Sequence, residues 1–430
     1  MVRRPLENIS EPKRKHGPVR RFFALLGPGL VTGAADDDPS GIATYSIAGA
    51  QLGTSMLWTA LLTFPLMAAV QMMCARIGMV TGTGLAAALR KKMPKPVLSL
   101  IALALFAANT VNVGADLSGM ADVANLLSGI HASFFVLGFG IAIIFATIWF
   151  KYNAIASTLK WLALSLFAYI ITAFIVHPDW PEVLAATFSP SWPTSHVQWS
   201  TLVAILGTTI SPYLFFWQSS QEVELEKARG QRTSASRRGA DPQELKDRAL
   251  DVGVGAFFSN IIMYFIILTT ALTLHKNGVT HLESSKDAVQ ALAPLAGHFA
   301  SLLYAVGLIG VGFLAIPTMA GSAAYVFVET FDFPQGLDEK LLHARAFYGI
   351  LVLSMLLGMV LTFTPIKPMD ALFLSAVING LLAPFVLVGI LLVACDSMLM
   401  QNQRSSMLAR ITVGITTIGM FAAGIAIFLV

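Results

Sequence analysis

Long apolar stretches separated by short polar segments follow one another along this chain from residue 22 to its end. A helix needs about 20 mostly apolar residues to cross the hydrocarbon core of a bilayer. Eleven stretches meet this requirement and are predicted to be membrane-spanning helices: 22–51, 56–79, 97–126, 134–150, 156–176, 200–220, 250–274, 297–328, 343–364, 370–395 and 409–430. The pattern therefore predicts an all-α polytopic membrane protein.

The composition excludes most other classes of protein. Of the 430 residues, 56% are hydrophobic and only 12% are charged, whereas soluble domains carry about 25% charged residues. A water-soluble enzyme, a nucleic-acid-binding protein and a disordered protein are all excluded. The two cysteines, Cys74 and Cys395, lie in apolar stretches and predict no disulfide framework.

The basic residues predict the orientation of the chain, because cytoplasmic connections carry an excess of Lys and Arg. If the N-terminus is cytoplasmic, 25 of the 28 Lys and Arg residues fall on the inside, and only Lys276, Lys286 and Lys367 lie outside. Residues 1–21 are then a cytoplasmic tail and the C-terminus is outside. We expect a monomer in the lipid bilayer of a bacterial inner membrane, and the net charge of +4 requires no nucleic-acid partner.

Most predicted spans have the plain apolar sequence of a membrane helix, but the first and the sixth do not. The first carries Pro39 directly after three aspartates, and the sixth carries Pro212 in the sequence Gly-Thr-Thr-Ile-Ser-Pro-Tyr. Proline lacks an N–H group and clashes with the preceding turn, so both helices should be interrupted. Interruptions five spans apart are typical of inverted repeats, here 22–176 and 200–395 with 409–430 as an extra helix, and they indicate a transport site near the bilayer midplane.

The three aspartates of the first span cannot face lipid. Even low estimates put the cost of one carboxylate at the bilayer centre at about 2.5–3.5 kcal/mol. Asp36, Asp37 and Asp38 are consecutive, so a continuous helix would point them about 100° apart and could not hide all of them. An unwound segment that faces a cation can accommodate them, and we expect a cation site here.

The first two spans carry a more specific pattern. Gly27-Pro28 precedes Asp38-Pro39, and the second span contains Leu57-Trp58 followed by Val80-Thr81-Gly82. In these motifs the chain resembles the NRAMP family of divalent metal transporters over its first ten spans. The resemblance implies the leucine-transporter fold, with two inverted five-helix repeats and broken helices 1 and 6. It also implies a metal site between those two helices.

The chain departs from the family at the implied metal site. Asp38 matches, but Gly41 occupies the family's Asn position, Ser211 its Met position and Tyr213 its His position, while Thr208 supplies the backbone carbonyl position. Thioethers favour softer transition metals, whereas carboxylates, carbonyls and water suit Mg²⁺ and Mn²⁺. We therefore predict Mg²⁺ transport, with Mn²⁺ also accepted, through a site that comprises Asp38, Gly41, Thr208, Ser211, Asp37 and Asp36.

Further polar residues are predicted to line the pathway or support the site: Tyr213, Gln218, Asn379, Asp116 and Glu222. Gln218 and Asn379 either line the pathway or satisfy backbone groups. Glu222 either lines the inner vestibule or marks a solvated helix end.

Proton coupling is the second family trait at issue. Asp116 matches the first residue of the family's Asp-x-x-Glu motif, but Gly119 replaces the Glu, and Tyr213 and Gln218 replace two histidines. Without these titrating groups, we expect transport without proton coupling, and Asp116 has either a structural or a residual proton role. No cofactor is expected besides the transported ion.

Two other functions are alternatives to this one. The first is a proton-coupled NRAMP importer of Mn²⁺ or Fe²⁺. The second is an intramembrane, Mg²⁺-dependent enzyme of the prenyltransferase type, which would need paired Asp-rich motifs and basic residues at the cytoplasmic ends of the spans. The sequence does not supply that pairing.

Overall fold

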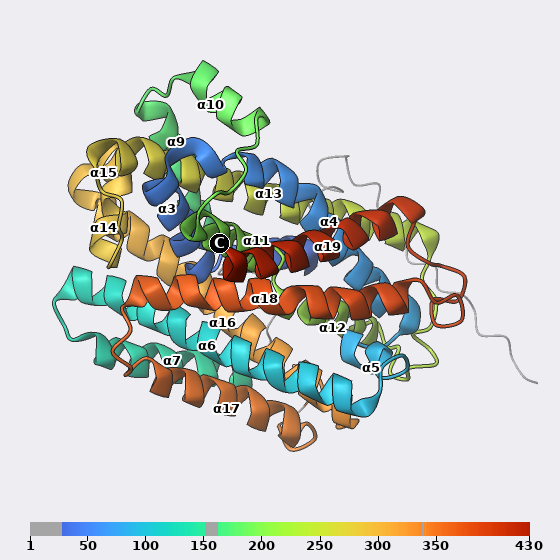
Figure 1. Cartoon of the computed structure of the whole chain (residues 1–430). Coiled ribbons are helices and arrows are strands. Elements are labelled where there is room, and N and C mark those ends of the chain that lie inside the picture. Colours follow the sequence, from blue (N-terminus) through green and yellow to red (C-terminus); the bar gives the residue numbers. More distant parts are fainter. Residues whose placement is uncertain (1–27, 151–161, 338, 340) are drawn as a thin grey trace, which may run out of the picture.

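The computed structural model describes residues 28–150, 162–337, 339 and 341–430, where all regular secondary structure is helical (Figure 1). Eight stretches of these residues are long and apolar enough to cross a membrane. The shorter apolar helices α9 (Phe167–Ile175) and α17 (Arg345–Leu361) and the broken pair α2–α3 occupy the other three predicted spans. The predicted all-α, multi-span architecture is confirmed. The predicted tail, 1–21, and the first residues of two predicted spans, 22–27 and 156–161, lie outside the described residues.

Most spans are single long helices near the predicted ranges. They are α4 (Trp58–Thr81), α6 (Lys95–Ser128), α7 (Ala132–Trp149), α13 (Pro242–Thr273), α16 (Ala300–Phe331), α18 (Pro368–Ala394) and α19 (Met407–Leu429). The largest difference is at α13, which begins eight residues before the predicted position 250. Asp241 caps that end, because its Oδ1 accepts a hydrogen bond from Gln243 N (2.9 Å) and Pro242 fills the first helical position.

Short helices occupy the connections. They are α5 (Leu85–Leu89), α10 (Trp180–Phe188), α14 (Ser285–Val289) and α15 (Ala293–Ala296). Asp122, near the end of α6, accepts a hydrogen bond from Ser285 N (2.8 Å). This contact fastens the beginning of α14 to α6.

The first span is broken where the sequence predicts. Helix α2 (Pro28–Asp36) ends at the aspartates and α3 (Pro39–Leu52) begins at the proline. Asp38 lies between them in an extended conformation (φ −68°, ψ 171°), and its Oδ1 accepts a hydrogen bond from Gly41 N (2.6 Å). Asp38 is therefore the N-cap of α3, which satisfies one of the N–H groups that a helix start leaves free.

The sixth span is broken in the same way. Helix α11 (His196–Thr209) ends before Ile210, which leaves the helical region (φ −115°, ψ 56°), and α12 (Pro212–Ala228) begins two residues later. The hydroxyl of Ser211 donates to the carbonyls of Gly207 and Thr208, both at 2.7 Å. These are carbonyls that the end of α11 leaves without a helical partner.

Four long helices enclose the broken pairs. Helix α13 packs against both α2 and α3, α16 packs along α6, and α11 packs along α18. In Figure 1, α6, α16 and α18 run beside one another and α11 lies near the middle of the molecule. The predicted break between Asp36 and Gly41 therefore lies inside the helical bundle.

Candidate metal transport site

The two breaks face each other. The hydroxyl of Tyr213, at the start of α12, lies 3.0 Å from Ala35 O and 3.2 Å from Asp38 Oδ2. A Cβ atom added to Gly41 would lie 3.1 Å from Thr208 Oγ1. Gly41 and Thr208 thus meet across the gap, as the resemblance implied, and Tyr213 reaches from one broken helix to the other.

The three aspartates divide into two groups. Asp38 Oδ2 faces Tyr213, whereas Asp36 Oδ2 and Asp37 Oδ1 both accept from the hydroxyl of Ser259 on α13 (2.7 and 3.1 Å). All three carboxylates are buried, with at most 4% of each residue exposed. The three aspartates were predicted to surround one ion. Their hydrogen bonds instead direct Asp36 and Asp37 toward α13 and only Asp38 toward α12.

Asp116 on α6 lies behind the break. Its Oδ1 accepts hydrogen bonds from Ser40 N (3.2 Å) and Ser40 Oγ (3.1 Å). The Ser40 hydroxyl also lies 2.8 Å from that of Ser375 on α18. Asp116 therefore holds the first turn of α3, which agrees with the structural role considered for it.

A buried amide that the sequence analysis did not select completes the surroundings of Asp38. Asn112 on α6 lies one turn before Asp116, and its Nδ2 is 3.4 Å from Asp38 Oδ2. Asn379 on α18 donates from Nδ2 to Asn112 Oδ1 (3.4 Å). The spacing of Asn112 and Asp116, four residues on one helix face, is the signal that could have found it.

Ser211 occupies the position where the family has a methionine, but its hydroxyl is used as a cap. It donates to Thr208 O, the carbonyl predicted to bind the ion. A carbonyl has two lone pairs, so Thr208 O retains one for a cation while the hydrogen bond persists.

Gln218 and Glu222 belong to a second chain of polar contacts further along α12. Gln218 Oε1 accepts from the Thr32 hydroxyl of α2 (2.7 Å), and Gln218 Nε2 donates to Glu222 Oε1 (2.8 Å). Glu222 is 2% exposed and pairs with Arg248 of α13 (Nε to Oε1, 2.7 Å). The interpretation of Glu222 as a solvated helix end is therefore wrong.

Arg248 extends this chain back to α2. Its Nη1 lies 2.5 Å from Asp251 Oδ2, and the same carboxylate oxygen accepts from Gly29 N at the beginning of α2 (2.8 Å). One guanidinium thus neutralises two buried carboxylates, Glu222 and Asp251, that lie between α2, α12 and α13. The sequence showed Arg248 only as one of the cytoplasmic charges.

Replacing Arg248 by methionine should lower the free energy of unfolding by about 3 kcal/mol, because removing one partner of a buried ion pair leaves an uncompensated charge. Adding Glu222→Gln should restore part of the loss, since only Asp251 then remains charged. Thermal unfolding of the purified protein in detergent measures both effects. A double variant no more stable than R248M would show that this cluster does not join the three helices electrostatically.

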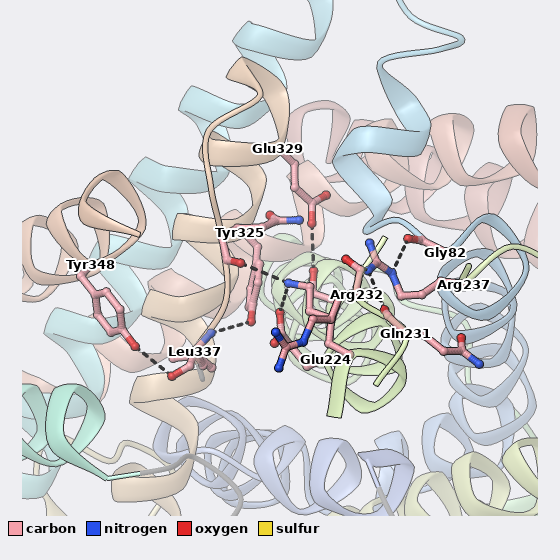
Figure 2. A network of polar contacts seen from close by, with 12 residues as sticks. Gly82, Glu224, Gln231, Arg232, Arg237, Tyr325, Glu329, Leu337 and Tyr348 are labelled. Atoms are coloured by element: carbon pink, nitrogen blue, oxygen red, sulfur yellow. Dashed lines mark hydrogen bonds and ion pairs between the residues drawn. The ribbon is translucent and has the colours of Figure 1, made fainter. Parts of the chain in front are cut away.

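A separate polar network surrounds the middle of α12 and the connection that follows this helix (Figure 2). Glu329 of α16 accepts from the Ser220 hydroxyl (3.2 Å) and from Ala87 N of α5 (3.1 Å). Arg237, in the connection after α12, donates from Nε to Gly82 O (3.0 Å). Glu329 thus ties the middle of α12 to α5 and α16, and Arg237 ties the connection after α12 to the residue that follows α4.

The charge balance of the site favours a cation. Asp36, Asp37, Asp38 and Asp116 are buried, and no described residue forms an ion pair with any of them. Their contacts are hydrogen bonds from neutral groups, such as Tyr213 with Asp38 and Ser259 with Asp36. Buried charges are costly unless they are paired, so a positive ion between the two breaks would be strongly attracted.

The fold and this site define the class of the protein. Residues 29–430 match the model of the family described as natural resistance-associated macrophage protein-like, or Nramp. The chain belongs to the Nramp family, and the resemblance noted in the first two spans is confirmed.

Individual relatives agree with this assignment. The protein is 28% identical over 393 residues to the divalent metal cation transporter MntH of Deinococcus radiodurans, a match that covers 87% of this chain and 82% of that protein. It is 24% identical over 408 residues to the MntH of Caldanaerobacter subterraneus, covering 91% and 90%.

Solved structures show the fold. The manganese transporter of Eremococcus coleocola superposes with a TM-score of 0.71 at 19% identity, covering 96% of this chain and 87% of that one. MhsT in complex with L-phenylalanine superposes with a TM-score of 0.58 at 14% identity, covering 94% and 97%. The chain has the leucine-transporter fold expected from the resemblance, whereas the exact bounds of its two repeats remain a prediction.

Proposed function

We propose that this Nramp protein carries a hard divalent cation, Mg²⁺ with Mn²⁺ also accepted, across the membrane by alternating access. The observation that carries the proposal is Asp38, a buried carboxylate without an ion-pair partner among the described residues, at the junction of two broken helices. Mg²⁺ is usually bound through one or two carboxylates and keeps several waters. The names of the MntH relatives support divalent metal transport in general.

We also propose that transport is not coupled to protons. Asp116 is engaged by both the backbone and the hydroxyl of Ser40, and Gln218 replaces a titrating histidine with an amide that hydrogen bonds Thr32 and Glu222. The metal gradient and the membrane voltage would then drive the flux.

The orientation and assembly are proposed from the sequence alone. The N-terminus would be cytoplasmic and the C-terminus outside, in a monomer of a bacterial inner membrane. Metal would enter the cell through this route because both the voltage and the carboxylates attract cations.

A proton-coupled importer of Mn²⁺ or Fe²⁺ is the second candidate. The specific finding in its favour is the fold match to a manganese transporter. The protein is not an enzyme of the prenyltransferase type, since its family and its relatives are transporters.

Proteoliposomes that contain a Mg²⁺ or Mn²⁺ indicator and, in parallel, a pH dye test the proposal. We expect uptake of both metals, stimulation by an inside-negative voltage, and no change in internal pH beyond that of protein-free vesicles. Fe²⁺ or Cd²⁺ uptake without Mg²⁺ flux or competition would contradict the proposed substrate. Metal-driven acidification would contradict uncoupled transport and favour the second candidate.

A further inference from the structure

A methionine thioether lies beside the candidate site, although Ser211 removes the one that the family places on the sixth span. Met319 of α16 is fully buried, and its Sδ lies 2.8 Å from Asn112 Nδ2. The same Nδ2 lies 3.4 Å from Asp38 Oδ2. A single amide nitrogen thus lies near both a carboxylate oxygen from the break before α3 and a sulfur from α16.

Rotation of this amide would turn it from a donor into a ligand. An asparagine side chain presents its oxygen and its nitrogen on opposite edges of one flat group with nearly the same shape. A half-turn about χ2 of Asn112 would bring Oδ1 to the place of Nδ2. Asn112 Oδ1 would then lie beside both Asp38 Oδ2 and Met319 Sδ, so that three potential ligand atoms would be neighbours.

The neighbouring amide can follow such a rotation. Asn379 now donates from Nδ2 to Asn112 Oδ1, and its own Oδ1 is buried with no hydrogen-bond partner among the described residues. If Asn112 turned its NH₂ group toward α18, a half-turn of Asn379 would present Oδ1 as the acceptor. The hydrogen bond between the two amides would be kept in both arrangements. The Ser40 hydroxyl, which now donates to Asn112 Oδ1 (3.2 Å), would accept from the turned NH₂ group while it donates to Asp116 Oδ1. An unpartnered buried acceptor is otherwise unfavourable.

We propose that Asn112 and Met319 are ligands of the transported cation and that they complete, with Asp38, a site built from α6, α16 and the break before α3. This proposal rests on the proposed function and deepens it. Carboxylate and amide oxygens suit Mg²⁺ and Mn²⁺, and the thioether adds affinity for a softer ion. The site therefore accepts Mg²⁺ and Mn²⁺ but binds Cd²⁺ with help from the sulfur.

The chain supplies its own matched control. Asn260 of α13 donates from Nδ2 to the thioether of Met67 on α4 (3.4 Å), and its Oδ1 accepts from the Thr63 hydroxyl (2.7 Å). This second pair has the same chemistry and burial as Asn112 and Met319. Neither residue has a hydrogen bond to a carboxylate among the described residues.

The experiment measures binding of Mg²⁺, Mn²⁺ and Cd²⁺ by titration calorimetry to the detergent-purified protein and to four variants. These are N112L and M319L at the proposed site, and N260L and M67L at the control pair. Leucine is close to methionine in volume and is well tolerated in its place. We expect N112L to weaken binding of all three ions by roughly tenfold or more. We expect M319L to weaken Cd²⁺ binding by about tenfold while Mg²⁺ binding changes by less than about twofold.

Cd K-edge X-ray absorption gives a readout that does not depend on affinity. A sulfur neighbour of bound Cd²⁺ should be present in the wild type and in M67L and absent in M319L. If N112L does not fold, M319L carries the test by itself.

The possible failures are distinguishable. A wild type that binds and transports no divalent cation overturns the proposed function. Wild-type binding with N112L and M319L indistinguishable from N260L and M67L, or a Cd²⁺ site without sulfur, overturns only the ligand assignment.

Discussion

Replacing Asp38 by asparagine should reduce Mg²⁺ and Mn²⁺ uptake into proteoliposomes by roughly 100-fold or more, because losing one charged partner in a buried site costs about 3–5 kcal/mol and each 1.4 kcal/mol is a factor of ten. The fold should survive, since asparagine is as good an N-cap as aspartate and can still accept the hydrogen bond from Gly41 N. Uptake and thermal unfolding are measured on the same preparation.

Two further variants separate the charge from the cap. D38A should lose as much metal uptake as D38N does. It should also lose about 1 kcal/mol of stability, because the N-terminus of α3 is then uncapped. D122N is the control variant. It changes a carboxylate that accepts a hydrogen bond from Ser285 N at the start of α14, away from the broken helices, and it should retain most of the metal uptake. Uptake by D38N within threefold of the wild type would remove Asp38 from the transport site.

Replacing Gly207 by alanine should destabilise the protein by on the order of 3 kcal/mol, which is the upper range for overpacking a core. A Cβ atom at this position would lie 2.1 Å from Ala376 O and 2.3 Å from Gly380 N, both in the backbone of α18. Backbone cannot rotate aside, so α11 and α18 would have to separate at the turn before the break. We expect a lower unfolding temperature and loss of metal uptake.

Gly138 provides the matched control for this prediction. It lies in α7 with no atom within 4 Å of an added Cβ, so G138A should be neutral or should gain up to about 1 kcal/mol from helix propensity. Equal unfolding temperatures for G207A and G138A would show that the close approach of α11 and α18 is not required.

The broken helices could be predicted from the sequence because their cause is a local combination of a proline with a polar residue before it. Proline alone does not break a helix here, since α4, α16 and α18 continue through Pro65, Pro317 and Pro384. Pro39 and Pro212 remove backbone donors, and residues beside them, Asp38 and Ser211, satisfy the freed groups. The number and order of the spans were predictable for a similar reason, since each depends on a continuous apolar run. The N-terminal boundary of α13 was missed because a cap at Asp241 extends the helix beyond its apolar part.

The separation of Asp38 from Asp36 and Asp37 could not be predicted, because it depends on the backbone conformation at the break in the first span. Asp36 and Asp37 contact Ser259, which is more than 200 residues away in sequence, and nothing local indicates that contact. The proposed role of Met319 could not be predicted either. In the sequence, a single methionine in an apolar span looks the same as a residue that only packs in the core. The role of Glu222 could not be predicted either, because its ion-pair partner Arg248 lies on another helix.

The transported ion is proposed to bind at Asp38 between the two broken helices. Anomalous scattering from crystals grown with Mn²⁺ would locate the ion. We expect one strong peak within the bundle, at bonding distance from Asp38 Oδ2, that disappears in D38N. A strongest peak beside Ser259 between Asp36 and Asp37, or one unaffected by D38N, would contradict it.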